Sequence, residues 1–183
     1  HHLQPFTFAV KTLGKKQYTL YGSAFNNRKS EAQDSKANLC VFLDNRWMQE
    51  YSPVWINTSM GSLHQGTASR KLNPDIRLGA SIETPTIFLD WPDMGVLDIK
   101  DLRPVVEYLA NRLANAHLMA SRIEIGCIGG HGRTGTLMAL IMVQLGCNPG
   151  TAIKTIRKDY CKRAIETKKQ EELIKAYAKE VQG

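Results

Sequence analysis

The sequence predicts an α/β fold, with a central, mostly parallel sheet flanked by helices on both faces. Three short apolar runs, residues 39–43, 86–89 and 123–127, are bounded by charged or turn-forming residues, which is typical of buried strands. Between and after them, apolar residues recur at the spacing of one helical face. Strands mixed with helices in this way favour a sheet covered by helices.

Weaker patterns add two candidate strands, at residues 54–57 and 18–21. We expect the second to be an edge strand, because it lies in a polar, turn-rich N-terminal segment, residues 1–35.

The chain has no internal repeat and no Gly/Ser-rich or Pro-rich linker, so residues 1–183 are expected to form one domain. The first two residues, both histidine, are interpreted as the remnant of a purification tag.

Four helices are expected. Residues 99–119 carry apolar side chains on one face, which suits a helix that covers the sheet. Residues 133–145 are apolar nearly all round, so this helix is predicted to be buried at the centre, with Gly146 ending it. Two more helices are predicted from their N-terminal caps: one to about residue 160 after Asn148-Pro149, and one to about residue 181 after the capping box Thr167 to Gln170.

The composition is that of an ordinary globular protein, with 43% hydrophobic and 22% charged residues, which excludes a disordered chain. Lysine and arginine exceed aspartate and glutamate by 24 to 17, a net charge of +7. A solvated helical face is one interpretation of this surplus; attraction of nucleic acid, acidic lipid headgroups or phosphoproteins is the other. The surplus is concentrated in one segment: Lys154, Arg157, Lys158, Lys162, Arg163, Lys168 and Lys169.

The four cysteines are too few for a disulfide scaffold and lack the CxxC spacing of zinc sites, so a reducing compartment and no metal are expected. The longest apolar run, residues 137–143, is too short to span a bilayer. The N-terminus lacks the apolar core of a signal peptide. We therefore expect a cytoplasmic protein.

The strand at 123–127 leads into a glycine-rich stretch, residues 126–135, in which five residues separate Cys127 from Arg133. Such a loop can turn its backbone N–H groups inward as an anion nest, and the helix that follows adds its positive end. The positive potential of these N–H groups and of the helix end is expected to make Cys127 a nucleophilic thiolate. Arg133 is expected to bind two phosphate oxygens. Thr134 can donate a hydrogen bond to the sulfur. The expected phosphate cradle is Ile128, Gly129, Gly130, His131, Gly132 and Arg133.

Three other interpretations of this loop are open. Residues 130–135 fit the G-x-G-x-x-G pattern of dinucleotide-binding domains, but no second strand follows the helix. Residues 127–134 approach a Walker A loop, but Cys127 replaces its first glycine and Arg133 its lysine. The third is a tight turn with an inert buried cysteine.

Breaking a phosphate ester requires a proton for the leaving oxygen, and a carboxylic acid on a second segment can supply it. The strand at 86–89 runs directly into Asp90-Trp91-Pro92-Asp93-Met94-Gly95-Val96. Asp93 is the favoured general acid, and Asp90 is the alternative, with a loop cap as its other role. Trp91 is interpreted as a hinge and packing residue.

The two loops together resemble a known family. Trp91-Pro92-Asp93 with Gly95-Val96 is similar to the mobile acid loop, the WPD loop, of protein tyrosine phosphatases, and residues 127–135 resemble their C-x5-R-[S/T]-G signature. The loops follow each other in the family's order, and the resemblance covers roughly residues 39–181. It implies that Cys127 attacks phosphorus and forms a phosphocysteine intermediate, that Arg133 and the loop amides bind the oxygens, and that Asp93 is the general acid and then the base. It implies no metal and no cofactor.

A third, weaker similarity lies in residues 164–170, which resemble the family's segment with a water-positioning glutamine. Glu166 occupies the place of the first glutamine, so Gln170 is the better candidate. A capping-box role for Gln170 is an equal alternative, and the two roles can coexist.

Departures from the family pattern shape the functional hypothesis. Gly126 stands where the family usually has histidine, which implies reduced activity or an inactive phospho-binding module. His131 either adds positive charge toward a polyanionic substrate or is a solvent-contacting residue at the rim. The cysteine loop lacks the lysines typical of phosphoinositide phosphatases, and no phosphotyrosine-recognition loop is visible. We expect a compact, dual-specificity-like protein phosphatase for phosphotyrosine, with RNA 5′ ends or phosphoinositides as alternative substrates.

Overall fold

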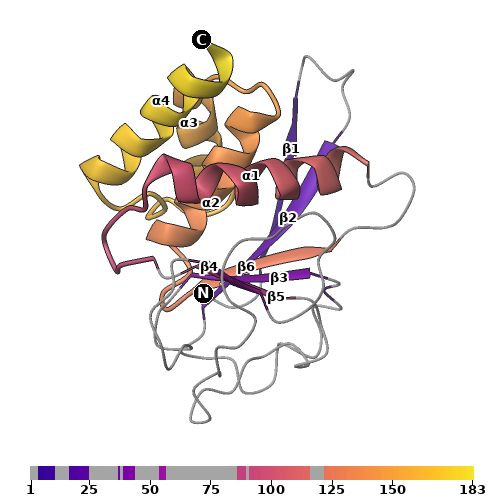
Figure 1. Cartoon of the computed structure of the whole chain (residues 1–183). Helices are drawn as coiled ribbons and strands as arrows, with labels where there is room; N and C mark the ends of the chain where they lie inside the picture. Colours follow the sequence, from indigo (N-terminus) through magenta and orange to yellow (C-terminus); the bar gives the residue numbers. More distant parts are fainter. Residues whose placement is uncertain are drawn as a thin grey trace.

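The computed structural model describes residues 4–10, 17–24, 37, 39–43, 54–56, 86–89, 91–115 and 122–183. These residues form one mixed sheet and a group of helices packed on it (Figure 1). Among them, no helix combines the length and hydropathy needed to cross a membrane.

The sheet has the strand order β1-β2-β6-β3-β5-β4. Strands β2, β6, β3 and β5 run parallel to one another, while β1 and β4 pair antiparallel with their neighbours at the two edges. The expected mostly parallel sheet is therefore confirmed. The strands are β1 (Gln4–Ala9), β2 (Gln17–Ala24), β3 (Leu39–Phe42), β4 (Val54–Ile56), β5 (Thr86–Leu89) and β6 (Ile123–Cys127).

The N-terminal segment contributes more to the sheet than its polarity suggested. The prediction of an edge strand at 18–21 was wrong, because β2 lies between β1 and β6 and a further strand, β1, forms the edge. Alternate residues of this hairpin are buried, among them Phe6, Phe8 and Leu20. Burial of these apolar side chains stabilises the two strands, although the residues between them are polar and point to the other face.

Four helices are described: α1 (Ile99–Ala114), α2 (Gly132–Gln144), α3 (Pro149–Asp159) and α4 (Lys168–Gln182). The predicted caps of α3 and α4 are confirmed: Asn148 accepts from two backbone N–H groups, and Thr167 and Gln170 form the capping box. Helix α1 ends at Ala114 instead of residue 119. Asn115 is its C-cap, and its backbone lies outside the helical conformation.

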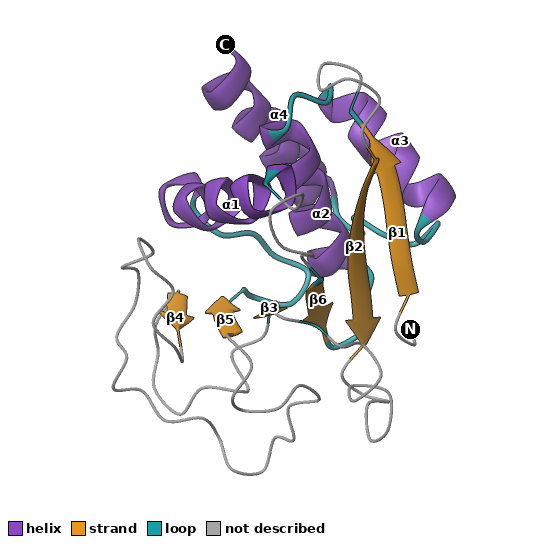
Figure 2. Cartoon of the chain, turned by 90° about the vertical axis from the view of Figure 1, so that its right-hand side faces the viewer, coloured by secondary structure: helices purple, strands orange, loops and turns teal. Residues whose placement is uncertain are grey.

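All four described helices lie on one side of the sheet (Figures 1 and 2). The α/β class of the fold is therefore confirmed. In the described part of the chain, no helix covers the opposite face, where the sequence predicts a second helical layer.

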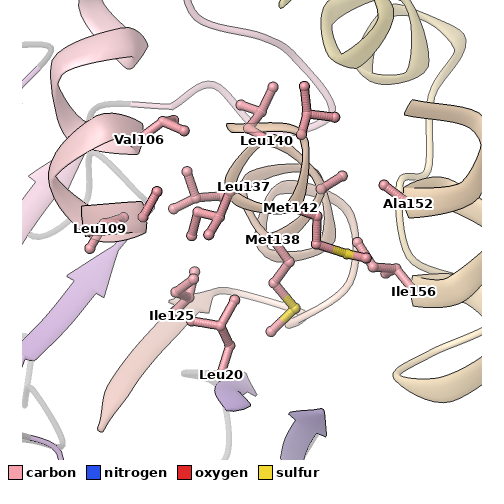
Figure 3. Packing of buried hydrophobic residues seen from close by; sticks show 14 of the residues in the cluster. Leu20, Val106, Leu109, Ile125, Leu137, Met138, Leu140, Met142, Ala152 and Ile156 are labelled. Carbon is pink, nitrogen blue, oxygen red and sulfur yellow. The ribbon is translucent and has the colours of Figure 1, made fainter. Parts of the chain in front are cut away.

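Helix α2 is the centre of the core, as its apolar sequence predicts. Every residue from Gly132 to Val143 is buried. Figure 3 shows α2 between α1 on one side and α3 on the other, with the sheet residues Leu20 and Ile125 beneath Met138. Because the start of this helix is fixed by packing on three sides, the loop that precedes it is held in one place relative to the sheet.

Candidate active site

Cys127 is the last residue of β6 and lies at the base of a tight loop that leads into α2. It is 2% exposed, and its Sγ accepts hydrogen bonds from the backbone N–H of Gly130 at 3.2 Å and from Oγ1 of Thr134 at 3.1 Å. Two donors directed at one sulfur stabilise a negative charge on it, as a nucleophilic thiolate requires. We call residues 127–133 the cysteine loop.

Gly130 determines the shape of this loop. Its φ of +72° lies in the region that favours glycine, and a Cβ here would lie 3.0 Å from the carbonyl oxygen of Ser23 on β2. The hydroxyl of Tyr160 donates a hydrogen bond to the carbonyl oxygen of Gly130 at 2.6 Å. Burial, followed by the thiols of Cys127 and Cys161, raises the pKa of Tyr160, so this hydroxyl keeps its proton and remains a donor.

Arg133 connects the cysteine loop to a second loop from a distant part of the chain. It is 3% exposed, and its Nη1 donates to the carbonyl oxygen of Trp91 at 3.0 Å. Its Nη2 lies 3.3 Å from Oδ1 of Asp93. The guanidinium is thus fixed beside the carboxylate, with its planar fork oriented by a backbone carbonyl.

The segment that carries Asp93, residues 91–96, follows strand β5 closely, and we call it the acid loop. Trp91 is fully buried, and its indole N–H donates to the carbonyl oxygen of Gly95 at 2.8 Å. The N–H of Gly95 donates to the carbonyl oxygen of Pro92 at 3.0 Å, which closes a turn around Asp93. The carboxylate of Asp93 is therefore presented outward, 78% exposed, next to Arg133. Asp90, the alternative acid, lies outside the described residues.

Gln170, at the start of α4, is fully buried and bonded at both ends of its amide. Its Oε1 accepts from the N–H of Thr167 at 3.3 Å, as the capping box predicts, and also from the N–H of Glu166 at 2.9 Å. Its Nε2 donates to the carbonyl oxygen of Gly95 at 3.2 Å, which the sequence did not indicate. Gln170 thus connects α4 to the acid loop.

Glu166 has a different environment from Gln170. It is exposed, and a Cβ on Gly132 would lie 3.0 Å from its Oε1, so its carboxylate rests against the start of α2. Gln170 and Glu166 are the two candidates for positioning the attacking water, and of these Glu166 is exposed to solvent while Gln170 is buried.

Solved structures of low sequence identity have the same arrangement of elements. Kinase associated phosphatase aligns with a TM-score of 0.66 at 16% identity, over 100% of this chain and 98% of that chain. Tk-PTP in the active form aligns at 0.60 and 16%, over 87% and 91%. PTPMT1 in complex with PI(5)P aligns at 0.57 and 18%, over 89% and 92%. The chain has the protein tyrosine phosphatase fold.

Two uncharacterized proteins of Methanocaldococcus jannaschii are each 33% identical to the chain, over 99 and 96 residues. The matches cover 54% and 52% of this chain and 63% and 56% of those proteins, so the chain spans less than two thirds of these relatives. No protein-family model matches the sequence.

His131 is partly buried at the cysteine loop and contacts the protein through one ring nitrogen. Its Nδ1 lies 3.1 Å from Sγ of Cys161, and the residue is partly buried. Burial, followed by the charge of Arg163, lowers the pKa of His131, so the ring is uncharged at neutral pH. The hypothesis that it adds positive charge for a polyanionic substrate is not supported.

The dinucleotide-binding interpretation of the cysteine loop is disfavoured by the topology. After α2 the chain continues into α3 and α4, with no strand following, so the βαβ unit of a dinucleotide fold is incomplete. Among the described residues, no three His, Cys, Asp or Glu side chains come together as a metal-binding group.

Two site contacts could not be found by sequence reasoning. Tyr160 reaches Gly130 only because Gly22 on β2 lacks a side chain: a Cβ there would collide with the phenol ring. Arg157, which belongs to the basic run, donates to the carbonyl oxygens of Ala164 and Ile165 and pairs with Glu171 at 2.6 Å. Both contacts depend on how α3 packs against distant segments, which no local pattern specifies.

Proposed function

We propose that this protein is a cysteine-dependent phosphatase of the protein tyrosine phosphatase superfamily, and that residues 1–183 act as one catalytic domain in the cytoplasm. Its substrates would be phosphate monoesters, most favourably phosphotyrosine in proteins, with dual specificity toward phosphoserine or phosphothreonine. The observation that carries this proposal is the position of Arg133, which is buried between the cysteine loop and the acid loop and contacts both Trp91 and Asp93. An inert glycine turn does not require such a connection.

In the first step, the Cys127 thiolate attacks phosphorus and forms an S–P bond while the P–O bond to the leaving group breaks. Asp93 gives its proton to the leaving oxygen. The amides of the cysteine loop and the fork of Arg133 hold the equatorial oxygens, where negative charge is spread in the transition state. This step leaves a phosphocysteine and an Asp93 carboxylate.

In the second step, water attacks phosphorus, Asp93 takes its proton, and the S–P bond breaks to restore the thiolate and release inorganic phosphate. Thr134 and the N–H of Gly130 already donate to the sulfur, so they stabilise the thiolate as it leaves. Gln170 would act by holding the acid loop, through the carbonyl of Gly95, and Glu166 is the solvent-accessible candidate for positioning water.

Similar structures hold both kinds of phosphate ester. PTPN18 is in complex with HER2 phospho-peptides, and PTPMT1 is in complex with PI(5)P. Protein phosphotyrosine is favoured here because the cysteine loop carries Ile128 and an uncharged His131 where a phosphoinositide enzyme is expected to carry lysines.

The deciding experiment measures hydrolysis of para-nitrophenyl phosphate, in the presence of a chelator, by the wild type, Cys127→Ser and Asp93→Ala. We expect Cys127→Ser to be inactive and Asp93→Ala to lose roughly 10²-fold or more in kcat with little change in binding, as for removal of a general acid. Activity that survives Cys127→Ser, or that the chelator abolishes, contradicts the mechanism. Turnover of a phosphotyrosine peptide, triphosphorylated RNA and inositol lipids then identifies the substrate class.

A further inference from the structure

A buried polar contact that the mechanism above does not use lies on the far face of the sheet, the face opposite the helices. Ile125 and Cys127 of β6 belong to the core beneath the helices, so Glu124 between them in the strand alternation points to the far face. There Oγ of Ser23, on β2, donates a hydrogen bond to Oε1 of Glu124 at 2.9 Å. Ser23 is 1% exposed and Glu124 is 0% exposed. Burial of a carboxyl group is costly without hydrogen bonds, so this contact ties β2 firmly to β6.

The contact between Ser23 and Glu124 passes beside Gly126, the residue that stands where the family usually has histidine. In the pairing of β2 with β6, Ser23 is opposite Gly126, and Tyr21 is opposite Glu124. The two polar side chains therefore meet diagonally across the strands, next to a position that has no side chain. The guanidinium of Arg122 lies over the ring of Tyr21, with 4.3 Å from Cζ to the ring centroid. A row of polar side chains thus runs along the far face toward the end of β2.

Ser23 connects this row to the cysteine loop. A Cβ on Gly130 would lie 3.0 Å from the carbonyl oxygen of Ser23 and 3.1 Å from the backbone nitrogen of Ala24. The peptide group between these two residues is therefore the wall against which Gly130 packs. The N–H of Gly130 points at Sγ of Cys127, at 3.2 Å. The position of Ser23 thus determines where this N–H lies relative to the sulfur.

We propose that Ser23 and Glu124 are positioning residues for the reaction at Cys127, and that they fix the cysteine loop from β2 in a chain that lacks the histidine before the cysteine. This inference rests on the proposed function and deepens it. Ser23 acts through Gly130, whose N–H stabilises the thiolate. A negative charge near the sulfur disfavours the thiolate, whereas the hydrogen bond from Gly130 favours it, so a role in charge and a role in position have opposite signs.

The test measures how fast iodoacetamide alkylates Cys127 at different pH values, followed by mass spectrometry of the peptide that contains this residue. Ser23→Ala removes the donor to Glu124 and loosens the wall behind Gly130. We expect a smaller thiolate fraction, and therefore about tenfold slower alkylation at about pH 6. Glu124→Gln keeps an acceptor oxygen in the same place and removes only charge, so its rate should equal or exceed that of the wild type. The kcat/KM for para-nitrophenyl phosphate should follow the same order.

The matched control is Tyr177→Phe, which removes a hydroxyl from another buried hydrogen bond, to Gln144, away from the cysteine loop. Urea unfolding of each variant establishes that it is folded and gives its loss of stability. Tyr177→Phe should be destabilised and keep the alkylation rate of the wild type. The double variant Ser23→Ala/Glu124→Gln should react no more slowly than Ser23→Ala, because the two residues act as one pair.

Three results would overturn the positioning role of Ser23 and Glu124. They are an unchanged alkylation rate in Ser23→Ala, an equal fall of the rate in Tyr177→Phe, and an equal fall in Glu124→Gln. Failure of the proposed function shows separately, as wild-type protein that does not hydrolyse para-nitrophenyl phosphate, since alkylation requires no turnover.

Discussion

The hydroxyl of Tyr160 donates a 2.6 Å hydrogen bond to the carbonyl oxygen of Gly130, so the end of α3 holds the cysteine loop. Tyr160→Phe keeps the ring packed against Phe6 but leaves this buried carbonyl without its donor. We expect a loss of about 1–3 kcal/mol in the free energy of unfolding, measured in urea. We also expect roughly a tenfold fall in kcat/KM, because the N–H of Gly130 that points at Cys127 loses its fixed position.

Tyr177 provides the control for that variant. It is also buried, and its hydroxyl donates to Oε1 of Gln144 at 2.6 Å, away from the cysteine loop. Tyr177→Phe should destabilise the protein without lowering kcat/KM. If the two variants lose activity equally, Tyr160 has no specific role in the site.

Gln170 is predicted to stabilise both α4 and the acid loop. Gln170→Ala removes the bond that its Oε1 accepts from the N–H of Thr167 and its hydrogen bond to Gly95, so both stability and kcat should fall, kcat by about tenfold as Asp93 is presented less precisely. Thr167→Ala removes the other part of the box alone, at about 1 kcal/mol of stability. Urea unfolding and para-nitrophenyl phosphate kinetics of both variants separate the roles. A normal kcat for Gln170→Ala would show that it only caps the helix.

His131 should make stability depend on pH. Its pKa in the folded protein lies below the ordinary value of 6.5, because of burial and then Arg163. As the pH falls through about 6.5, the unfolded chain takes up a proton at this residue before the folded chain does, so stability falls. His131→Asn should therefore flatten the decrease in melting temperature between about pH 7 and about pH 5. An NMR titration that places the pKa of His131 at or above 6.5 would contradict this assignment.

The features that could be predicted from sequence are those that depend on residues close together in the chain. Strand β6, the buried helix α2 and the caps of α3 and α4 follow from apolar runs and from Asn148 and Thr167. The cysteine and acid loops were found because loop glycines, Cys127, Arg133 and Asp93 form short motifs. Arg133 contacts Trp91 and Asp93, so the two loops lie together. Their catalytic roles stay predictions.

What sequence reasoning missed depends on tertiary contacts. Strand β1 was missed because a short run of alternating residues is stabilised only by pairing with β2 and packing on α3. The environment of His131 could not be predicted, since burial and Arg163 act on it across the fold. Likewise the positive φ angles of Met94 and Ile165 appear only where the acid loop and the segment after α3 line a common pocket.

Thr134 tests the second chemical step by itself. Its Oγ1 donates to the sulfur of Cys127 at 3.1 Å, and the residue is fully buried, so Thr134→Val removes the donor with almost no change in shape. The sulfur is the leaving group when phosphocysteine is hydrolysed, so this step should slow more than its formation, by roughly 10–10²-fold. Rapid mixing with para-nitrophenyl phosphate should then show a burst of nitrophenol followed by a slow steady state. Thr134→Ser, which restores the donor, should remove the burst. If Thr134→Val shows no burst and forms phosphocysteine slowly, the hydroxyl instead supports the thiolate as it attacks.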